Sequence, residues 1–271
     1  MHRSIRLLRL FLREQSEPGV FYIELAEDSI GQVAGFAPLA GQTVLDLGGG
    51  PGYFTAAFLA RGARCLLVEP DVTALQSGRT PPDGPLAGLT QPSSPASPAA
   101  GTVRGDGMAL PVADGSVDVC FSSNVLEHVR DPIAMLAEMA RVTRPGGVIY
   151  LAFTNWFSPW GGHEMAPWHY LGASYAERRY LRVHGKIPKN RPGTGLFPVH
   201  VGQMLRATRA RRDISVLAAV PRYYPRWARA VLAVPGLREI VTWNLLLVLR
   251  REPDQAVGTG PVTATVGSSA S

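Results

Sequence analysis

The segment from Val44 to Phe54 reads VLDLGGGPGYF and carries the strongest chemical signal in the chain. An apolar run leads into clustered glycines, and Pro51 suits the first turn of a helix. Glycine lets the backbone turn tightly and lets a ligand lie directly against it. The exposed N–H groups of a helix start attract a carboxylate or a phosphate. The pattern therefore predicts a ligand-binding turn between a strand and a helix.

The spacing of the glycines distinguishes two kinds of ligand. Dinucleotide-binding turns follow G-x-G-x-x-G/A, and here Gly48 and Gly50 fit but Tyr53 occupies the third position. The chain instead reads D-x-G-x-G-x-G, from Asp46 to Gly52. A carboxylate at Asp46 would repel a pyrophosphate, whereas it suits a ligand that carries an ammonium group. This spacing disfavours a nicotinamide-dependent oxidoreductase.

A second acidic residue stands at the spacing that a ribose requires. Glu69 ends the next apolar run, 21 residues after Gly48. A ribose-binding acid is expected about 20 residues after the glycine turn, where its carboxylate accepts hydrogen bonds from both hydroxyls. The two signals together predict a ligand that contains a ribose and an ammonium group.

Further motifs extend the pattern along the chain. Residues 105–111 read GDGMALP, residues 122–129 read SSNVLEHV before Asp131-Pro132, and residues 144–147 read RPGG. With the glycine loop, they resemble the type 11 group of class I S-adenosylmethionine (SAM)-dependent methyltransferases over about residues 40–155. The later segments GGHEM, HYLG and PRYYPRWA resemble an actinobacterial methyltransferase family of unassigned substrate, which extends the resemblance over nearly the whole chain.

The resemblance implies SAM as cofactor and assigns residues to it. In this family an aspartate after the third strand binds the adenine amino group, and Asp106 matches it; a carboxylate is a sensible acceptor for an exocyclic amine. The residues expected at the cofactor are Asp46, Gly48, Gly49, Gly50, Gly52, Glu69, Asp106, Gly107, Met108, Ser122 and Asn124.

The catalytic candidates are fewer, because a sulfonium is a good leaving group and alignment supplies much of the rate. An oxygen or nitrogen acceptor can still need a base. We name His128, which follows the fourth strand, and His163 and Glu164 in an aromatic segment. The spacing of His163, Glu164 and His169 is not H-E-x-x-H and no cysteine is nearby, so we expect no metal site.

These residues need a fold that gathers them at one edge of a sheet. From Thr43 onward, short apolar runs alternate with helical stretches, which is typical of a parallel sheet with crossover helices. We predict a Rossmann-like α/β fold with a seven-stranded, mostly parallel sheet, helices on both faces and a lid inserted after the fifth strand. The predicted strands are 43–47, 64–69, 102–105, 117–122, 148–153, 214–220 and 243–249. The predicted helices between them include 52–60, 72–76, 131–144 and 225–242, the last of them broken near Pro235.

Composition divides the chain into segments. We predict an N-terminal helical segment over 1–40 and a SAM-dependent methyltransferase domain over 41–251, with the lid over 154–212. The Pro- and Ser-rich residues 79–101 and the polar residues 252–271 cannot bury a core, so we predict a disordered loop and a disordered tail there. Near the N-terminus we expect an amphipathic helix, packed on the domain or lying on a membrane, whose apolar face comprises Ile5, Leu8, Phe11 and Leu12.

Charge is unevenly distributed along the chain, whose net charge is +6. Residues 41–170 carry 7 basic and 11 acidic groups, and residues 171–251 carry 16 basic and 3 acidic groups. A basic face suits an acidic substrate, an anionic membrane or nucleic acid, but no RNA-binding module accompanies the core, which disfavours nucleic acid. Cys65 and Cys120 lie in apolar runs, so we expect buried, reduced thiols and a cytoplasmic protein, with peripheral membrane contact left open.

The sequence therefore predicts methyl transfer from SAM to a small-molecule or lipid-like acceptor. Two alternatives remain: a methyltransferase acting on a macromolecule, either protein or RNA, and a SAM-binding protein without catalytic activity. The sequence indicates neither the acceptor atom nor the oligomeric state.

Overall fold

A seven-stranded sheet forms the centre of the protein, here a computed structural model that describes residues 3–11, 17–80, 84–87 and 100–253. The strand order is β3-β2-β1-β4-β5-β7-β6. All neighbouring pairs are parallel except the two that β7 makes, with β5 and with β6. The strands are β1 (Thr43–Leu47), β2 (Arg64–Glu69), β3 (Ala100–Arg104), β4 (Val117–Ser123), β5 (Thr143–Thr154), β6 (Ile214–Pro221) and β7 (Asn244–Arg251). The predicted α/β fold is confirmed.

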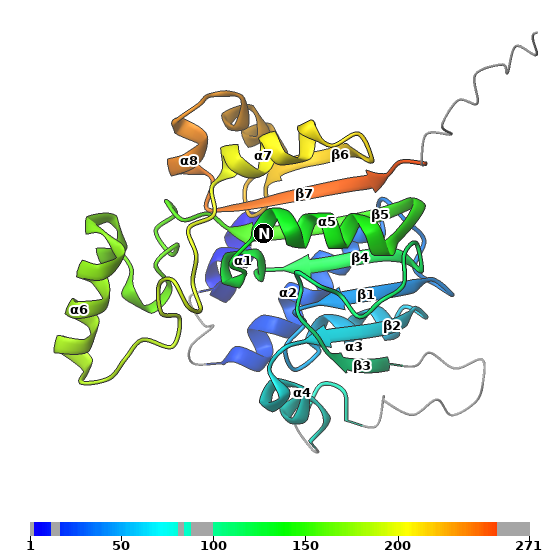
Figure 1. Ribbon diagram of the computed structural model, residues 1–271, viewed down its shortest axis with the longest axis horizontal. Coiled ribbons are helices and arrows are strands. Elements are labelled where there is room, and N and C mark those ends of the chain that lie inside the picture. The colour runs from blue at the N-terminus through cyan, green and yellow to red at the C-terminus, as the bar shows by residue number, and fades with distance from the viewer. Residues whose placement is uncertain (1–2, 12–16, 81–83, 88–99, 254–271) are drawn as a thin grey trace, which may run out of the picture.

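Helices cover both faces of this sheet (Figure 1). α2 (Pro18–Val33), α3 (Tyr53–Leu59) and α4 (Val72–Arg79) pack on one face. α5 (Pro132–Val142) and α7 (Val201–Ala210) pack on the other. The remaining helical elements are α1 (Arg3–Phe11), η1 (Leu126–His128), η2 (His163–Met165), η3 (Trp168–Leu171), α6 (Ala173–His184), η4 (Arg226–Ala233) and α8 (Leu237–Val241).

The strand pleat assigns alternate residues to the two cores. On β1, Val44 joins the core beneath α2 and α3, whereas Leu45 and Leu47 join the core beneath α5 and α7. On β4, Phe121 and Cys120 divide between the two cores in the same way. Because helices bury both faces, the central strands are nearly continuous apolar runs.

The predicted start of α5 is confirmed. Asp131 lies just before the helix, and its Oδ1 accepts hydrogen bonds from the N–H groups of Ile133 and Ala134, both at 3.0 Å. Pro132 occupies the first turn, where the missing N–H costs nothing. The helix ends at Val142, two residues earlier than predicted, because Thr143 already pairs with the sheet at the start of β5.

The prediction for the N-terminal helix was partly wrong. α1 forms, but Ile5, predicted on the apolar face, is 48% exposed, and Leu7, which was not predicted there, is buried. The side chains of Leu8 and Phe11 lie outside the described part of the structure. Arg3 sets this orientation, because its guanidinium donates to both carboxylate oxygens of Asp28 on α2, at 2.8 and 2.6 Å. Leu12 lies outside the described residues.

The helix predicted over 225–242 is broken near Pro235 as expected, but its first part is 3₁₀ rather than α-helical. A 3₁₀ segment, η4, and a short helix, α8, replace it, with Gly236 at a φ of 80° between them. Trp227 is 77% exposed on this basic segment, and membrane contact stays a prediction. Among the described helices, none combines the length and apolar character needed to cross a bilayer.

The inserted segment after β5 is shorter than the predicted lid over 154–212. Figure 1 shows α6 standing off the edge where β1 and β4 end. α7, by contrast, buries Val201, Met204 and Leu205 in the core against the sheet. We therefore keep the name lid for residues 155–200.

The Pro- and Ser-rich segment contributes one core residue that the sequence analysis missed. Residues 81–83 and 88–99 lie outside the described part of the chain, as do residues 254–271, so the predicted disorder there stays a prediction. Leu86 lies between residues 81–83 and 88–99 and is buried in the core beneath α3. Its backbone N–H donates a hydrogen bond to the carbonyl of Gly78 at 2.8 Å. β3 also begins two residues earlier than predicted, at Ala100.

The division between lid and core can be tested with two leucine substitutions. Leu205→Ala on α7 should lower the free energy of unfolding by about 2–5 kcal/mol, because it leaves a cavity in the core. Leu181→Ala on α6 is the matched control: Leu181 is 47% exposed, so the change should stay within about 0.5 kcal/mol. Urea unfolding measures both, and equal losses would contradict this division.

Candidate functional site

The glycine loop leaves β1 in a conformation that only glycine adopts readily. The φ angles are 71° at Gly48, 56° at Gly50 and 99° at Gly52. A side chain at Gly48 would come within 2.5 Å of Cγ2 of Val125, and one at Gly49 within 2.3 Å of Oδ2 of Asp46. Gly50 instead has open space where a side chain would stand. The loop is therefore packed against Asp46 at Gly49 and against Val125 at Gly48, and it has open space at Gly50.

Asp46 lies beneath this loop and does not line a pocket. It is 1% exposed, and its Oδ2 accepts a hydrogen bond from Thr55 Oγ1 at 2.7 Å. Burial raises the pKa of Asp46 to about 7, against the lowering effect of the hydrogen bonds from Thr55. The structure therefore shows Asp46 as a support for the loop, and the predicted contact with a ligand's ammonium group stays a prediction.

Glu69 lies at the end of β2 with its carboxylate held from both sides. Oε2 accepts from the N–H of Gly50 at 3.0 Å, and Oε1 accepts from the N–H of Asp71 at 3.1 Å. Each oxygen keeps a further lone pair for a hydroxyl group. The carboxylate is fixed beside the loop, and the predicted ribose contact stays a prediction.

A groove of about 640 Å³ runs along the carboxyl ends of β1 to β4. It brings together six of the predicted cofactor residues: Gly48, Glu69, Asp106, Gly107, Met108 and Asn124. Asp106 is oriented by its own turn, because its Oδ1 accepts from the N–H of Met108 at 2.9 Å. Gly193, Thr194 and Phe197 of the lid form a wall that the sequence analysis missed, since their positions follow no motif.

The other predicted cofactor residues do not line this groove. Gly49, Gly50 and Gly52 shape the loop beside it. Ser122 is fully buried in β4, and its hydroxyl donates to the carbonyl of Leu47 at 3.1 Å, which ties β4 to β1. Ser122 therefore has a structural contact, and its predicted contact with the cofactor stays a prediction.

The three catalytic candidates differ in their surroundings. His128 lines the groove, and its Nδ1–H donates to the carbonyl of Gly195 at 2.6 Å. The His163 ring lies 5.0 Å from the His128 ring, and burial lowers the pKa of His163, with Glu127 acting in the opposite direction. Glu164 is engaged within the lid, where it accepts hydrogen bonds from the backbone N–H and Nδ2 of Asn190 at 2.7 and 2.9 Å. Catalysis by any of them stays a prediction.

A buried arginine, missed by the sequence analysis, lies behind the end of β4. Arg222 is 1% exposed, and its guanidinium donates to Ser123 Oγ at 2.9 Å, to Asn124 Oδ1 at 3.4 Å and to Ser29 Oγ at 2.7 Å. Among the described residues, no carboxylate oxygen lies within 4.0 Å of it. Asn124 also accepts from Nδ2 of Asn244 at 2.8 Å. The backbone φ of Asn124 is 58°, which is uncommon for a residue other than glycine.

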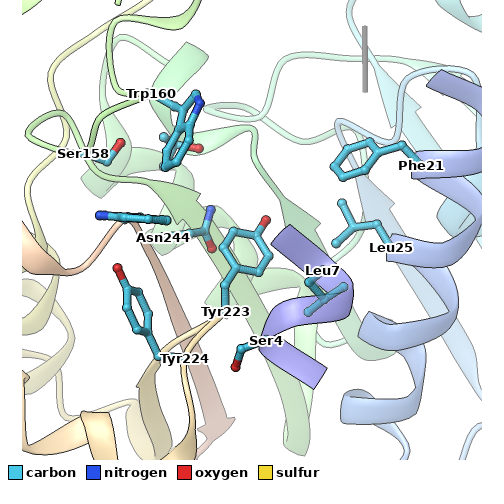
Figure 2. Close-up of a pocket in the computed structure, with 11 residues that line it drawn as sticks. Ser4, Leu7, Phe21, Leu25, Ser158, Trp160, Tyr223, Tyr224 and Asn244 are labelled. Atoms are coloured by element: carbon cyan, nitrogen blue, oxygen red, sulfur yellow. The ribbon is translucent and has the colours of Figure 1, made fainter. Parts of the chain in front are cut away.

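Asn244 lines a second, apolar cavity of about 210 Å³ (Figure 2). Trp160, Tyr223 and Tyr224 form one side, and Leu7, Phe21 and Leu25 of α1 and α2 form the other. Among the described residues that line it, none is charged at neutral pH. Its remaining lining residues are Ser4, Thr154, Ser158 and Trp243. The network of Asn124 and Asn244 therefore separates a polar groove from an apolar cavity.

The raised pKa of Asp46 predicts a specific pH dependence of stability. Between about pH 4 and pH 7 the unfolded chain ionises this carboxyl group while the folded protein keeps it protonated, so its contribution to stability falls as pH rises. Asp46→Asn removes this loss. Urea unfolding should show the free energy of the variant, relative to wild type, rising from about pH 4 to about pH 7 and constant above that. A pH-independent difference would contradict the prediction.

Comparison with known proteins agrees with this geometry. Residues 45–151 match the family described as a methyltransferase domain. Proteins described as uncharacterized methyltransferases from Mycobacterium avium (strain 104) and Mycobacterium sp. (strain JLS) are 49% and 48% identical over 255 residues, covering 92% of this chain and 94% of each relative.

Solved structures of low sequence identity share the fold. A SAM-dependent methyltransferase from Mesorhizobium loti is 19% identical with a TM-score of 0.54, over 84% of this chain and 100% of that chain. The Haemonchus contortus phosphoethanolamine N-methyltransferase 1, in complex with phosphoethanolamine and S-adenosylhomocysteine, is 15% identical with a TM-score of 0.58, over 94% of this chain and 51% of that chain. The chain belongs to the class I SAM-dependent methyltransferases, in the actinobacterial family of these mycobacterial relatives.

Proposed function

We propose that this enzyme transfers a methyl group from SAM to a small, uncharged and largely apolar acceptor that occupies the cavity of Figure 2. The observation that carries the proposal is the placement of this cavity: Asn244 in its wall bonds Asn124, which lines the groove. The lipid-like acceptor expected from the sequence is one member of this class.

The groove residues fit the parts of SAM. The Glu69 carboxylate, already fixed by two backbone N–H groups, would accept the ribose hydroxyls. Asp106 would accept from the adenine amino group, and the open face of Gly50 leaves room beside the glycine loop. When bound, SAM supplies a methyl group on a sulfonium, a good leaving group. The chain's own residues then have to hold and orient the acceptor.

The cavity favours an uncharged acceptor. Burying an ion without a partner is costly, and the described part of the cavity wall contains no charged side chain. The nearby Arg222 also disfavours a cationic amine, because no described carboxylate lies within 4.0 Å of its guanidinium. The Haemonchus enzyme bound to phosphoethanolamine therefore gives no guide to the acceptor here.

Unpaired polar atoms indicate that the acceptor also forms hydrogen bonds. Ser4 Oγ, Ser158 Oγ and Asn244 Oδ1 are buried at the cavity wall, and none has a hydrogen-bond partner among the described residues. Buried polar groups are normally paired, so such a group calls for an explanation. A hydroxyl or carbonyl group on an otherwise apolar acceptor would satisfy them.

The cavity itself is built for positioning rather than for proton removal. Burial raises the pKa of Tyr224 to about 12, so its hydroxyl stays protonated at neutral pH. The other wall residues are serine, threonine, asparagine, aromatic and aliphatic. Alignment of acceptor, methyl group and sulfur then accounts for the rate, and any base must come from outside the cavity wall.

The groove contact can be tested by Glu69→Ala. Loss of charge-assisted hydrogen bonds costs about 1.5–3 kcal/mol, so calorimetric titration should show SAM binding weakened by about 10- to 100-fold. Asp71→Ala is the control, since Asp71 follows on the same loop but does not line the groove. NAD should bind to neither of these two variants. An unchanged affinity of Glu69→Ala for SAM would mean that the ribose lies elsewhere.

The acceptor can be sought with SAM that carries a labelled methyl group. We expect label to enter the apolar small-molecule fraction of a cell extract and not the protein or RNA fraction. Label confined to protein or RNA would favour the macromolecular alternative, and binding of SAM without any transfer would favour a non-catalytic SAM-binding protein.

A pair of substitutions on α1 then tests whether the acceptor lies in the cavity. Ser4→Phe fills the cavity, and because a misplacement of about 1 Å can cost about 100-fold in rate, kcat/KM should fall on that scale. Ile5→Phe places the same aromatic side chain at a neighbouring residue that is 48% exposed, and it should leave kcat/KM unchanged. SAM affinity should be the same in both variants. Equal activity in both would place the acceptor outside the cavity.

A further inference from the structure

Three side chains that could ligate a metal converge where the lid meets the end of β4. One ligand atom from each of Glu127, His128 and His163 lies within 4.8 Å of the other two. Glu127 and His128 belong to η1, directly after β4, and His163 begins η2 in the lid. We name these three residues the Glu-His cluster.

Glu127 has a free oxygen in a place where one is costly. Its side chain is 2% exposed, and Oε1 accepts from the backbone N–H of Thr154 at 3.1 Å. Oε2 is buried and has no hydrogen-bond partner. A buried carboxylate normally has a cation or hydrogen-bond donors on both oxygens. Oε2 of Glu127 therefore needs a partner, and the described residues do not provide one.

Each histidine contributes one ring nitrogen to the cluster. The carbonyl of Gly195 can only accept, so His128 carries its proton on Nδ1 and keeps a lone pair on Nε2. A metal-binding histidine usually donates its other ring N–H to a carbonyl or carboxylate in this way. Nδ1 of His163 is buried without a partner. His163 is also held at a φ of 50°, which is uncommon for a residue other than glycine.

We propose that the Glu-His cluster binds a divalent transition metal ion, with zinc as the best match. Two imidazole nitrogens and one carboxylate oxygen are a known zinc ligand set that leaves a fourth position open. Tetrahedral zinc with bonds of about 2.1 Å holds its ligand atoms about 3.4 Å apart. The three ligand atoms lie within 4.8 Å of one another, so each pair must close by at most about 1.4 Å to bind an ion.

Such an ion would fasten the lid to the wall of the cofactor groove. His128 lines the groove, and Glu127 bonds the backbone of Thr154, which lines the apolar cavity. The ion would therefore lie between the two sites. The sequence expectation of no metal considered His163 with Glu164 and His169, whereas the fold brings His163 to Glu127 and His128 instead.

The test is calorimetric titration of the full, untagged chain with zinc chloride after removal of metals by chelator and dialysis. We expect about one zinc ion per chain. Loss of even an outer-shell partner weakens metal binding by about 10- to 100-fold, so Glu127→Gln and His163→Asn should each weaken it by more than about 100-fold. His184→Asn removes an exposed histidine of α6 and should change nothing. Circular dichroism of the metal-free proteins checks that each variant folds.

Zinc should also raise the unfolding temperature of the wild type and of His184→Asn, and of neither cluster variant. Absence of stoichiometric binding to the wild type would overturn the proposal, as would equal zinc affinity in the wild type and a folded cluster variant. These readouts need neither SAM nor an acceptor, so they are independent of the proposed methyl transfer.

Discussion

The reversal of strand order between β1 and β4 is the constraint on which the site depends. The chain builds outward from β1 to β3 and then returns to place β4 on the other side of β1. The connections after β1 and β4 therefore leave toward opposite faces, to α3 and to α5. A crevice opens where they part, which is where ligands bind in such sheets. Gly48 lies at its narrowest point, because any side chain there would meet Val125.

A buried polar network connects this crevice to the apolar cavity. Arg222, Asn124 and Asn244 come from three distant parts of the chain and bond one another at the end of β4. Inside a protein of low dielectric constant such hydrogen bonds are stronger than in water. The network fixes the wall between the cofactor groove and the proposed acceptor cavity, so the distance between the two sites does not depend on a mobile loop.

Two sets of buried polar atoms without a partner among the described residues lie at the two proposed binding sites. One set, on Ser4, Ser158 and Asn244, lies at the wall of the apolar cavity and suits an uncharged molecule with hydrogen-bonding groups. The other, on Glu127 and His163, combines a carboxylate with imidazole and suits a metal ion. The chemistry of the atoms separates the two, since hydroxyl and amide groups ligate transition metals poorly compared with imidazole and carboxylate.

The sequence by itself determined the features whose signals are local. Apolar runs fixed the bounds of β1 and β2, Asp131 and Pro132 fixed the start of α5, and the glycine spacing with Glu69 located the groove. Only the tertiary structure decided which face of α1 is buried, that α7 belongs to the core, and how Arg222 and the Glu-His cluster are assembled. Arg222 bonds Ser123 across 99 residues of sequence, and His163 reaches Glu127 only because the lid folds back over β4. Such contacts depend on how elements pack against each other, and no periodicity or spacing within one element records them.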